Sequence, residues 1–292
     1  MTTFTIGAAT VSRIEETYEP NFAAKDFFPK DWRPEIVEQH REWMLPNHYD
    51  PASGKLKLSI HSWLVKVGGR TILIDACVGN DKERPNRPLW HQLKTPWLDR
   101  LAKAGARADQ IDAVMCTHLH NDHVGWNTRL DNGRWVPTFP NARYLFDRTD
   151  FEHFKAIDPQ KQPGNAAAYQ DSVKPIADAG LADLVAGVHT ADEHLTLEPA
   201  PGHTPGTMFI TLASRGARAV FCGDILHQAI QVFHPEWNSF ACEDADNARK
   251  SRRKVLEHCA GNGALLMPTH FGAPFVCRVD AKGDAFVPRF GA

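Results

Sequence analysis

The sequence predicts an α/β protein, an αββα sandwich of two mixed β-sheets with helices on the outer faces. Short apolar runs alternate with amphipathic stretches, and the two halves of the chain follow a similar plan of strands and helices. Histidine and aspartate residues recur in loops that directly follow apolar runs, which places a candidate site at one edge of the sandwich. The 292 residues, 42% of them hydrophobic, suffice for a sizeable core, and we predict one domain over residues 1–292.

The first strand is expected over residues 4–14, and an unusual segment follows it. Residues 18–55 combine several prolines with aromatic side chains, a composition too aromatic for a disordered linker. One short helix is expected within this segment, over residues 34–43, because Pro34 suits a first helical turn. The segment is either an arm that packs on the surface or on a second subunit, or a lid that lines or covers a substrate pocket.

A β-hairpin follows the arm, because two strand-like runs, residues 56–67 and 70–75, flank Gly68-Gly69. Its second strand ends in Asp75. Further along we expect a helix over 95–107 with Thr95 as its cap and Pro96 at its first helical position, strands over 111–116 and 142–146, a helix over 147–154, a loop over 159–168 and a weakly helical stretch over 170–186.

The last third of the chain predicts a strand over 195–199, a hairpin over 207–213 and 218–221, a helix over 245–259 and a final strand over 264–267. The helix carries a run of basic side chains that we interpret as a solvated face: Arg249, Lys250, Arg252, Arg253 and Lys254.

The densest cluster of metal-binding residue types directly follows the strand over 111–116. His118 and His120 share parity, so an extended stretch would point both imidazoles to the same side. Asp122 and His123 follow at once, where a tight loop can turn them inward. A solvated polar loop would account for one or two of these residues, whereas three histidines and an aspartate at this spacing predict a metal site.

Three further residues share the setting of that cluster, although each is a weak signal alone. His203, Asp224 and His270 each follow a short apolar strand, in a loop that contains glycine or proline. The pattern His-x-His-x-Asp-His, together with these three residues in this order, resembles the metallo-β-lactamase superfamily across residues 56–272.

The resemblance implies a pair of metal ions and assigns their ligands. His118, His120 and His203 would hold the first ion, Asp122, His123 and His270 the second, and Asp224 would bridge both. Asp75 resembles the strand-end aspartate beneath the metals and would support a ligand rather than bind metal, with Cys77 in place of the usual glycine. Zinc is the first expectation, with iron, manganese or cobalt as alternatives.

The function expected from this site is hydrolysis by a hydroxide that bridges the two ions. Within the superfamily the chain most resembles the dinuclear lactonases and the methyl-parathion-hydrolase-like esterases, so an ester, lactone or organophosphate substrate is expected. His227 stands three residues after the bridging aspartate, where quorum-quenching lactonases commonly have tyrosine. It is a candidate catalytic acid, with Asp122 as a second proton-handling group; a packed or surface histidine is the alternative. A glyoxalase-II-like thioesterase, a β-lactamase and a non-catalytic metal-binding scaffold remain open.

Composition limits the partners. The net charge of −2 provides no basic footprint for nucleic acid, and no apolar run is long enough to cross a membrane. The six cysteines are scattered and form no Cys-x-x-Cys pair, so we expect them to be reduced in a cytoplasmic protein. A small-molecule substrate and a possible homodimer are the remaining expectations.

Overall fold

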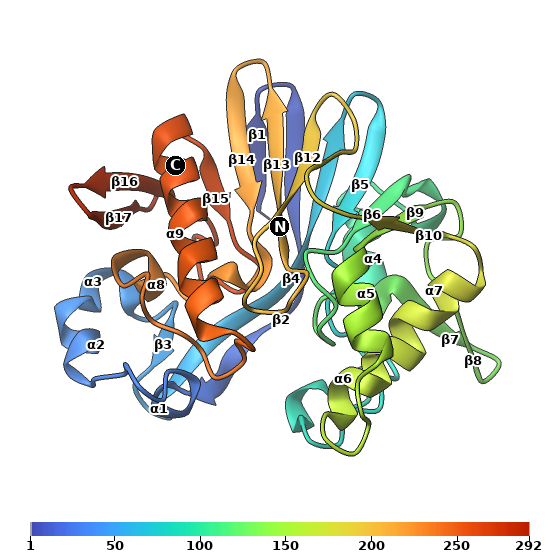
Figure 1. Cartoon of the computed structure of the whole chain (residues 1–292), viewed down its shortest axis with the longest axis horizontal. Helices are drawn as coiled ribbons and strands as arrows, with labels where there is room; N and C mark the ends of the chain where they lie inside the picture. Colours follow the sequence, from blue (N-terminus) through green and yellow to red (C-terminus); the bar gives the residue numbers. More distant parts are fainter. Residues whose placement is uncertain (1, 292) are drawn as a thin grey trace.

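The computed structural model describes residues 2–291 and consists of two packed β-sheets flanked by helices (Figure 1). The first sheet has the order β1-β2-β4-β5-β6-β9-β10, with β3 beside β4, and the second has the order β11-β12-β13-β14-β15. Both sheets are mixed, because parallel pairs such as β5 with β6 and β14 with β15 stand beside antiparallel ones. The αββα sandwich that the sequence predicts is confirmed.

The strands of the first sheet are β1 Thr3–Ile6, β2 Ala9–Ala23, β3 Tyr49–Asp50, β4 Lys55–Val67, β5 Arg70–Ile74, β6 Ala113–Met115, β9 Arg143–Asp147 and β10 Ala182–Val185. Those of the second are β11 His189–Thr190, β12 Leu195–Pro199, β13 Met208–Ser214, β14 Ala217–Phe221 and β15 Leu265–Met267. Two separate hairpins are formed by β7 Thr128–Asp131 with β8 Arg134–Pro137 and by β16 Arg278–Lys282 with β17 Ala285–Arg289.

The helices are α1 Ala24–Phe27, α2 Glu35–Gln39, α3 Arg41–Met44, α4 Trp97–Lys103, α5 Arg148–Lys155, α6 Pro163–Ala168, α7 Lys174–Asp178, α8 Ile230–Phe233 and α9 Ala245–Asn262. Short turns of other helix types are η1 Pro88–Trp90, η2 Ala108–Gln110, η3 Gly125–Asn127, η4 Tyr169–Val173 and η5 Gly223–Ile225. Within residues 2–291, no helix is long and apolar enough to span a bilayer.

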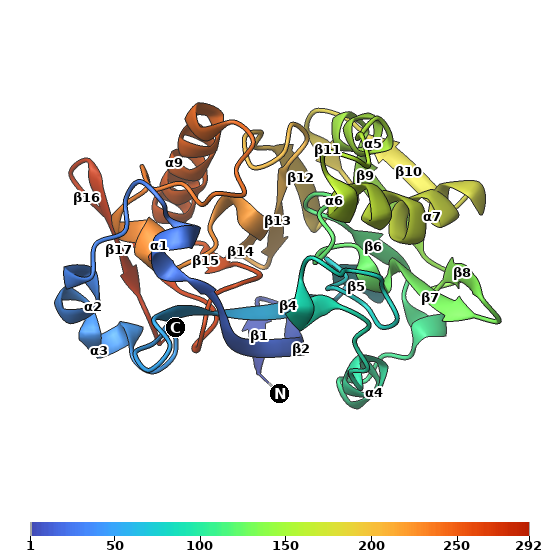
Figure 2. The ribbon, with the colours of Figure 1, turned by 90° about the horizontal axis from the view of Figure 1, so that it is seen from below.

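The alternation of side chains along each strand divides the core into layers. One set, which includes Trp63, Met115 and Phe221, packs between the two sheets. On the far side of the first sheet, apolar side chains meet α4, α5 and α7; on the far side of the second, they meet α9. Figures 1 and 2 show these helices covering opposite sides of the sandwich.

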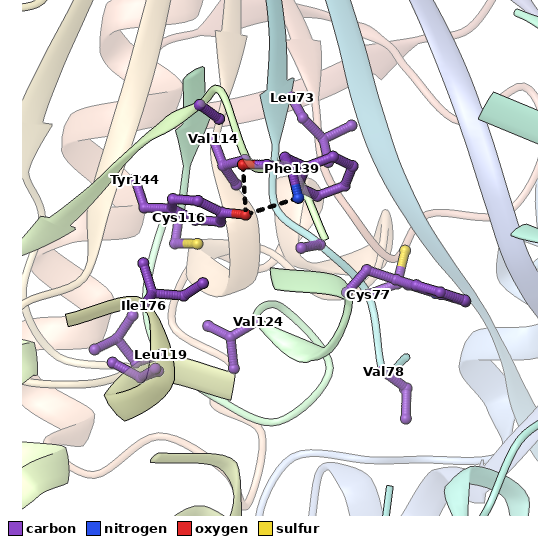
Figure 3. Close-up of a cluster of buried hydrophobic side chains, with 14 of the residues drawn as sticks. Leu73, Cys77, Val78, Val114, Cys116, Leu119, Val124, Phe139, Tyr144 and Ile176 are labelled. Carbon is purple, nitrogen blue, oxygen red and sulfur yellow. Dashed lines mark hydrogen bonds between the residues drawn. The ribbon is translucent and has the colours of Figure 1, made fainter. Parts of the chain in front are cut away.

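The layer beneath α7 includes the hydroxyl of Tyr144, whose hydrogen bonds are satisfied (Figure 3). The hydroxyl accepts from the backbone N–H of Phe139 at 3.1 Å, and carbonyl oxygens of Asn127 and Phe139 lie 3.2 and 3.3 Å away as acceptors. Since an unpaired buried hydroxyl would destabilise the fold, this local network lets a tyrosine occupy the core.

Residues 18–55 pack closely against the rest of the chain. They comprise the end of β2, the helices α1, α2 and α3, the strand β3 and the start of β4. Their apolar side chains, including Phe27, Phe28 and Met44, form a cluster with Ile230 and Trp237 of the second half. Figure 1 shows α1, α2 and α3 on the side of the molecule that also carries α8 and the β16–β17 hairpin.

Several predicted boundaries in the first 107 residues are wrong. The single strand over 4–14 is a hairpin, because Gly7 turns the chain with φ of 62° and β2 then pairs with β4 as far as Ala23. The predicted helix over 34–43 divides at His40, whose φ of −118° is not helical. The helix over 95–107 is shorter, Trp97–Lys103, and Thr95 does not cap it. Instead the backbone N–H of Thr95 donates to the side chain of Asn80.

Three later predictions are also corrected. The loop over 159–168 contains α6, which begins at Pro163. The stretch over 170–186 contains the strand β10. It pairs in parallel with β9, which is distant in sequence, and a local residue pattern does not indicate such a pairing. On α9, Arg252 is fully buried and not solvated, because its guanidinium donates to the carbonyls of Ile225 and Pro235. The β7–β8 and β16–β17 hairpins were not predicted.

Candidate active site

All seven predicted ligand side chains meet at one edge of the sandwich. The loop after β6 carries His118, His120, Asp122 and His123. His203 lies in the loop after β12, and His270 lies in the loop after β15. Asp224 lies in the turn η5, which follows β14. Since β12, β14 and β15 run in the same direction in the second sheet, their carboxyl ends share one edge.

The first group of potential ligands consists of His118, His120, His203 and Asp224, whose donor atoms lie within 4.8 Å of one another. Nδ1 of His120 lies 3.0 Å from Nε2 of His118 and 2.8 Å from Nε2 of His203. Three imidazole nitrogens therefore converge on one point from three different directions. Neutral imidazoles in this arrangement suit a divalent ion.

The second group consists of Asp122, His123 and His270. Oδ1 of Asp122 lies 3.9 Å from Nε2 of His123, and Oδ2 of Asp122 lies 3.5 Å from Nε2 of His270. All three side chains are buried. One carboxylate oxygen and two imidazole nitrogens form a second candidate metal position.

Asp224 lies between the two groups and presents a different oxygen to each. Its Oδ2 is 3.2 Å from Nε2 of His203, in the first group. Its Oδ1 is 3.1 Å from Nε2 of His123 and 2.9 Å from Nε2 of His270, in the second. A carboxylate placed in this way can bind one ion with each oxygen.

The donor set fits metal ions better than it fits a purely hydrogen-bonded core. Nε2 of His123 and Oδ1 of Asp224 are buried without a hydrogen-bond partner, although buried polar atoms are nearly always satisfied. The close nitrogen contacts of the first group would also need a proton between each pair of rings. Ions at the two positions would satisfy these atoms together, so the residues present fit a metal at both.

Burial and charge shift the pKa of these groups in different directions. Burial lowers the pKa of His123, His203 and His270, but the Asp224 carboxylate outweighs it, so the pKa of each is raised above its ordinary value. Burial, helped by neighbouring imidazoles, holds the pKa of His118 and His120 well below its ordinary value, which favours the neutral form that binds metal. Burial alone would raise the pKa of Asp224, but the surrounding histidines, His270 foremost, hold it well below its usual range. Asp224 is therefore a carboxylate anion.

His227 lies beside this set without joining either group. Its Nε2 is 3.2 Å from Oδ2 of Asp224, but both ring nitrogens are without hydrogen-bond partners among the described residues. The ring faces the cavity next to Phe27, at 5.3 Å between centroids. Burial lowers the pKa of His227 to about 4, so the ring is neutral and carries one N–H.

A buried carboxylate on the far side of the second group orients its ligands. Asp75 accepts from the ring of His123, with Oδ2 2.9 Å from Nδ1. It also accepts from the backbone and hydroxyl of Thr117, and from the hydroxyl of Thr269, the residue before His270. Such contacts fix the tautomer and orientation of a ligand. Cys77 adopts a left-handed φ of 46°, a conformation that favours glycine, the residue that the resemblance leads us to expect here.

A second buried carboxylate, Asp150 in the first turn of α5, plays the corresponding part for the first group. It accepts from the backbone N–H of Leu119, between His118 and His120, at 3.2 Å. It also accepts from the hydroxyl of Thr204 at 2.8 Å and from the backbone of Gly206 at 2.6 Å. Asp150 thus joins two ligand loops that are far apart in sequence.

Two glycines allow the loops to approach this closely. A Cβ on Gly206 would lie 2.2 Å from Oδ1 of Asp147 and 2.5 Å from the backbone nitrogen of Asp150. Gly223, with φ of 47°, would place a Cβ 2.3 Å from the hydroxyl of Thr117. Because Thr117 precedes His118 and Gly223 precedes Asp224, this contact sets the first ligand against the bridging one.

The site opens into a cavity of about 640 Å³. His120, Asp122, Asp224, His227 and His270 form its floor. Its walls are largely aromatic, from Phe22 and Phe27 of the arm, Trp90 and Phe240, with Asn86, Arg87, Gln162 and Asn165 among the polar residues. The arm thus contributes directly to the cavity.

Sequence reasoning missed two residues near the ligands. Asp150 resembles any acidic residue at a helix start, so no local signal separates it from an ordinary surface side chain. Cys242 lines the cavity, with Sγ 3.8 Å from Nδ1 of His203. Cys222, two residues before Asp224, is buried in the apolar layer beneath α9 and belongs to neither group of ligands. All six cysteines are free.

Comparison with known proteins gives one family and several structural neighbours. The family model for the metallo-beta-lactamase superfamily matches residues 57–270. YybB of Bacillus subtilis, a probable metallo-hydrolase, is 23% identical over 196 residues, 66% of this chain and 73% of YybB. The hydroxyacylglutathione hydrolase of Aeromonas salmonicida is 31% identical over 131 residues, 45% of this chain but only 38% of that enzyme.

The solved structures agree with the fold over almost the whole chain. AidC, a dizinc quorum-quenching lactonase in complex with a product, N-hexanoyl-L-homoserine, has a TM-score of 0.83 at 22% identity and covers 100% of this chain and 97% of its own. AbOPH, a hydrolase in the beta-lactamase superfamily, has a TM-score of 0.81 at 20% identity and covers 99% of this chain and 97% of its own. At such identities the likeness establishes the fold.

Proposed function

The chain belongs to the metallo-β-lactamase superfamily of metal-dependent hydrolases, and we propose that it is a dinuclear enzyme that cleaves carboxylic esters or lactones. The observation that carries this proposal is Asp224, which faces two separate groups of ligands with its two oxygens. A single-metal site has no need of a carboxylate between two sets of imidazoles. The seven ligands are those expected from the sequence: His118, His120, Asp122, His123, His203, Asp224 and His270.

The protein's part in the reaction begins with holding the ions. His118, His120 and His203 would bind one, Asp122, His123 and His270 the other, and Asp224 both. Two divalent ions, when bound, supply Lewis acidity and make water a nucleophile near neutral pH. Zinc suits this set of nitrogen and oxygen donors, and iron, manganese and cobalt are alternatives.

The cavity supports a small-molecule substrate with an apolar part. A volume of about 640 Å³ lies in the range of small-molecule sites. Phe22, Phe27, Trp90 and Phe240 provide apolar walls, which favour an acyl chain or an aryl group and exclude water from it. The aromatic arm acts in this scheme as a wall of the pocket.

We assign the handling of protons to two side chains. Hydrolysis adds a hydroxyl group to the acyl carbon, breaks its bond to the leaving oxygen and delivers one proton to that oxygen. Asp122 faces the cavity and can hold the proton released by water on its carboxylate. His227 carries a ring N–H on the same floor and can hydrogen-bond to the leaving oxygen as negative charge develops there.

The test is a substrate panel on protein reconstituted separately with zinc, iron, manganese and cobalt. Lactones, aryl esters, thioesters, phosphotriesters and β-lactams should be compared by kcat/KM, and the metal content measured in each preparation. The proposal expects two ions per chain and the highest kcat/KM with an ester or lactone. A preference for thioesters would instead indicate a glyoxalase-II-like enzyme. Tight metal binding without turnover of any substrate would indicate a non-catalytic scaffold.

A further inference from the structure

The cavity contains one basic side chain whose position the proposed chemistry leaves unexplained. Of the residues that line it, Arg87 alone is a lysine or arginine. Its guanidinium is exposed and has no carboxylate partner among residues 2–291. An exposed arginine is usually only solvated, so the argument depends on what holds this one at the cavity.

Two aromatic rings hold the guanidinium over the cavity. Its central carbon lies 5.3 Å from the ring centroid of Phe22 and 5.6 Å from that of Phe240. The two rings also contact each other, at 5.4 Å between centroids, and both line the cavity. Cation–π contacts of this length orient a guanidinium without using its N–H donors, which stay available to a ligand.

The loop that carries Arg87 is anchored on both sides. The backbone N–H of Arg87 donates to the carbonyl of Arg84, and that of Trp90 donates to the carbonyl of Arg87, both at 2.8 Å. Arg84 is buried and binds Asp171 of η4 with two N–H groups, at 2.7 and 3.0 Å. Lys82, also buried, contacts the same aspartate. The guanidinium is thus presented by a fixed segment.

The other charges around the cavity are already engaged. Asp122 and Asp224 belong to the proposed metal positions. Glu243 pairs with His153 at 3.1 Å. Arg87 therefore adds an uncompensated positive charge at the aromatic wall, and the amide side chains of Asn86, Gln162 and Asn165 add neutral hydrogen-bonding capacity to the same cavity.

We propose that Arg87 binds an anionic group, a carboxylate, at the end of the substrate remote from the bond that is cleaved. Phe22 and Phe240 would hold the apolar part between that group and the reacting carbonyl. A planar guanidinium with free N–H groups matches a carboxylate in a bidentate arrangement. This inference rests on the proposed function and narrows its substrate class to esters or lactones of acidic molecules.

The first test uses two esters that differ only at the remote end. The 4-nitrophenyl monoester of adipic acid and 4-nitrophenyl hexanoate share the leaving group and the chain length, but only the former ends in a carboxylate. Zinc-loaded wild-type protein, R87Q, R87K and the control R134Q should be compared with both esters. Arg134 is an exposed arginine on β8 that does not line the cavity.

For the monoester, R87Q should raise KM about tenfold, the effect of losing one ion pair of about 1.4 kcal/mol. Hexanoate should change less than twofold, R87K should recover part of the loss, and R134Q should behave as wild type. The wild-type preference for the monoester should weaken as salt rises. Equal changes for both esters in R87Q, or no wild-type preference, would overturn the inference.

A second test is independent of turnover. Adipic acid monoanilide and hexananilide are amide counterparts of the two esters, and calorimetry on the zinc-loaded protein gives their affinities. The monoanilide should bind wild type and R134Q more tightly than hexananilide, and R87Q should remove that difference. A carboxylate bound to the metals would bind R87Q equally well, and that result would refute the role of Arg87. Failure of every variant to hydrolyse either ester would count against the proposed function alone.

Discussion

The two groups of metal-binding side chains are supported by different buried carboxylates. Asp75 supports the second group and hydrogen-bonds directly to a ligand, the ring of His123. Asp150 supports the first group but touches no ligand ring; it binds the backbone and hydroxyl groups of the loops that carry the ligands. Asp75 therefore orients the second group by a direct bond to a ligand ring, whereas Asp150 acts on the first group through the path of two loops. Asp75 reaches the first group only indirectly, because the hydroxyl of Thr117 donates to it and lies 3.1 Å from Nδ1 of His118.

This difference predicts how each group responds to substitution. A carboxylate bound to a ring fixes one tautomer, so its loss affects metal binding directly. A carboxylate bound to loops positions the ligands indirectly, by fixing the path of the backbone. Other close approaches, such as that of Gly223 to Thr117, help to fix the same path, so the loss of the carboxylate should have a smaller effect. The loss of metal binding on substitution should therefore be largest for Asp224, smaller for Asp75, smaller again for Asp150 and smallest for His227.

Asp224→Ala should have the largest effect, because it removes the carboxylate that, among residues 2–291, faces both groups. Five buried imidazoles would lose their shared counter-charge. We expect both ions to be lost together and kcat/KM to fall by more than about 100-fold, the upper end for outer supporting residues. Elemental analysis beside kinetics checks this. Retention of two ions in the variant would show that the groups do not share Asp224.

Asp75→Asn should come next and should act more on the second group, which it contacts directly, than on the first, which it reaches through Thr117. The amide cannot accept all four hydrogen bonds from His123, Thr117 and Thr269, so the His123 ring loses its fixed tautomer. A loss of 10- to 100-fold in affinity for one of the two ions is expected, roughly the range for supporting residues. Competition titration with a chelator measures each affinity. Equal weakening of both positions would contradict the separation between the groups.

Asp150→Asn should lower the affinity for the ion of the first group. The expected loss is about tenfold, the lower end of the range for supporting residues and less than that for Asp75→Asn. Its matched control is Asp147→Ala, at the N-cap that precedes the same helix. Asp147 caps α5 through the backbone of Thr149 and Asp150, so its loss should destabilise the fold by about 1 kcal/mol. That control should lower the melting temperature without weakening either ion. If both variants change metal affinity alike, Asp150 acts only through the stability of α5.

The same contrast explains which parts of the candidate site could be predicted from the sequence and which could not. The cluster from His118 to His123 is contiguous, and His203, Asp224 and His270 share a strand-end setting, so the residue pattern and the resemblance together brought out all seven side chains that meet at this edge. Asp75 also ends a strand. Asp150, by contrast, lies in a helical turn and gains its role only when β12 and β6 bring their loops together, which no local pattern encodes. The pairing of β10 with β9 was missed for the same reason.

His227→Ala should have the smallest effect on the metals, because His227 belongs to neither group and supports no ligand loop. Its ring lies 4.9 Å from that of His203 and stacks at 6.1 Å with that of His270, so it touches both groups from the cavity side. Metal content should remain at two ions per chain. If the ring N–H assists departure of the leaving oxygen, the loss must depend on how much help that oxygen needs.

Phenyl acetate and 4-nitrophenyl acetate separate these cases, because 4-nitrophenolate leaves readily without a proton donor. We expect His227→Ala to lower kcat for phenyl acetate by about 100-fold, the lower end for general acid catalysis, and to leave 4-nitrophenyl acetate within a few-fold of wild type. His227→Gln, which keeps an N–H donor, should recover part of the loss. An equal loss for both esters would mean that His227 shapes the cavity beside Phe27 and takes no part in proton delivery.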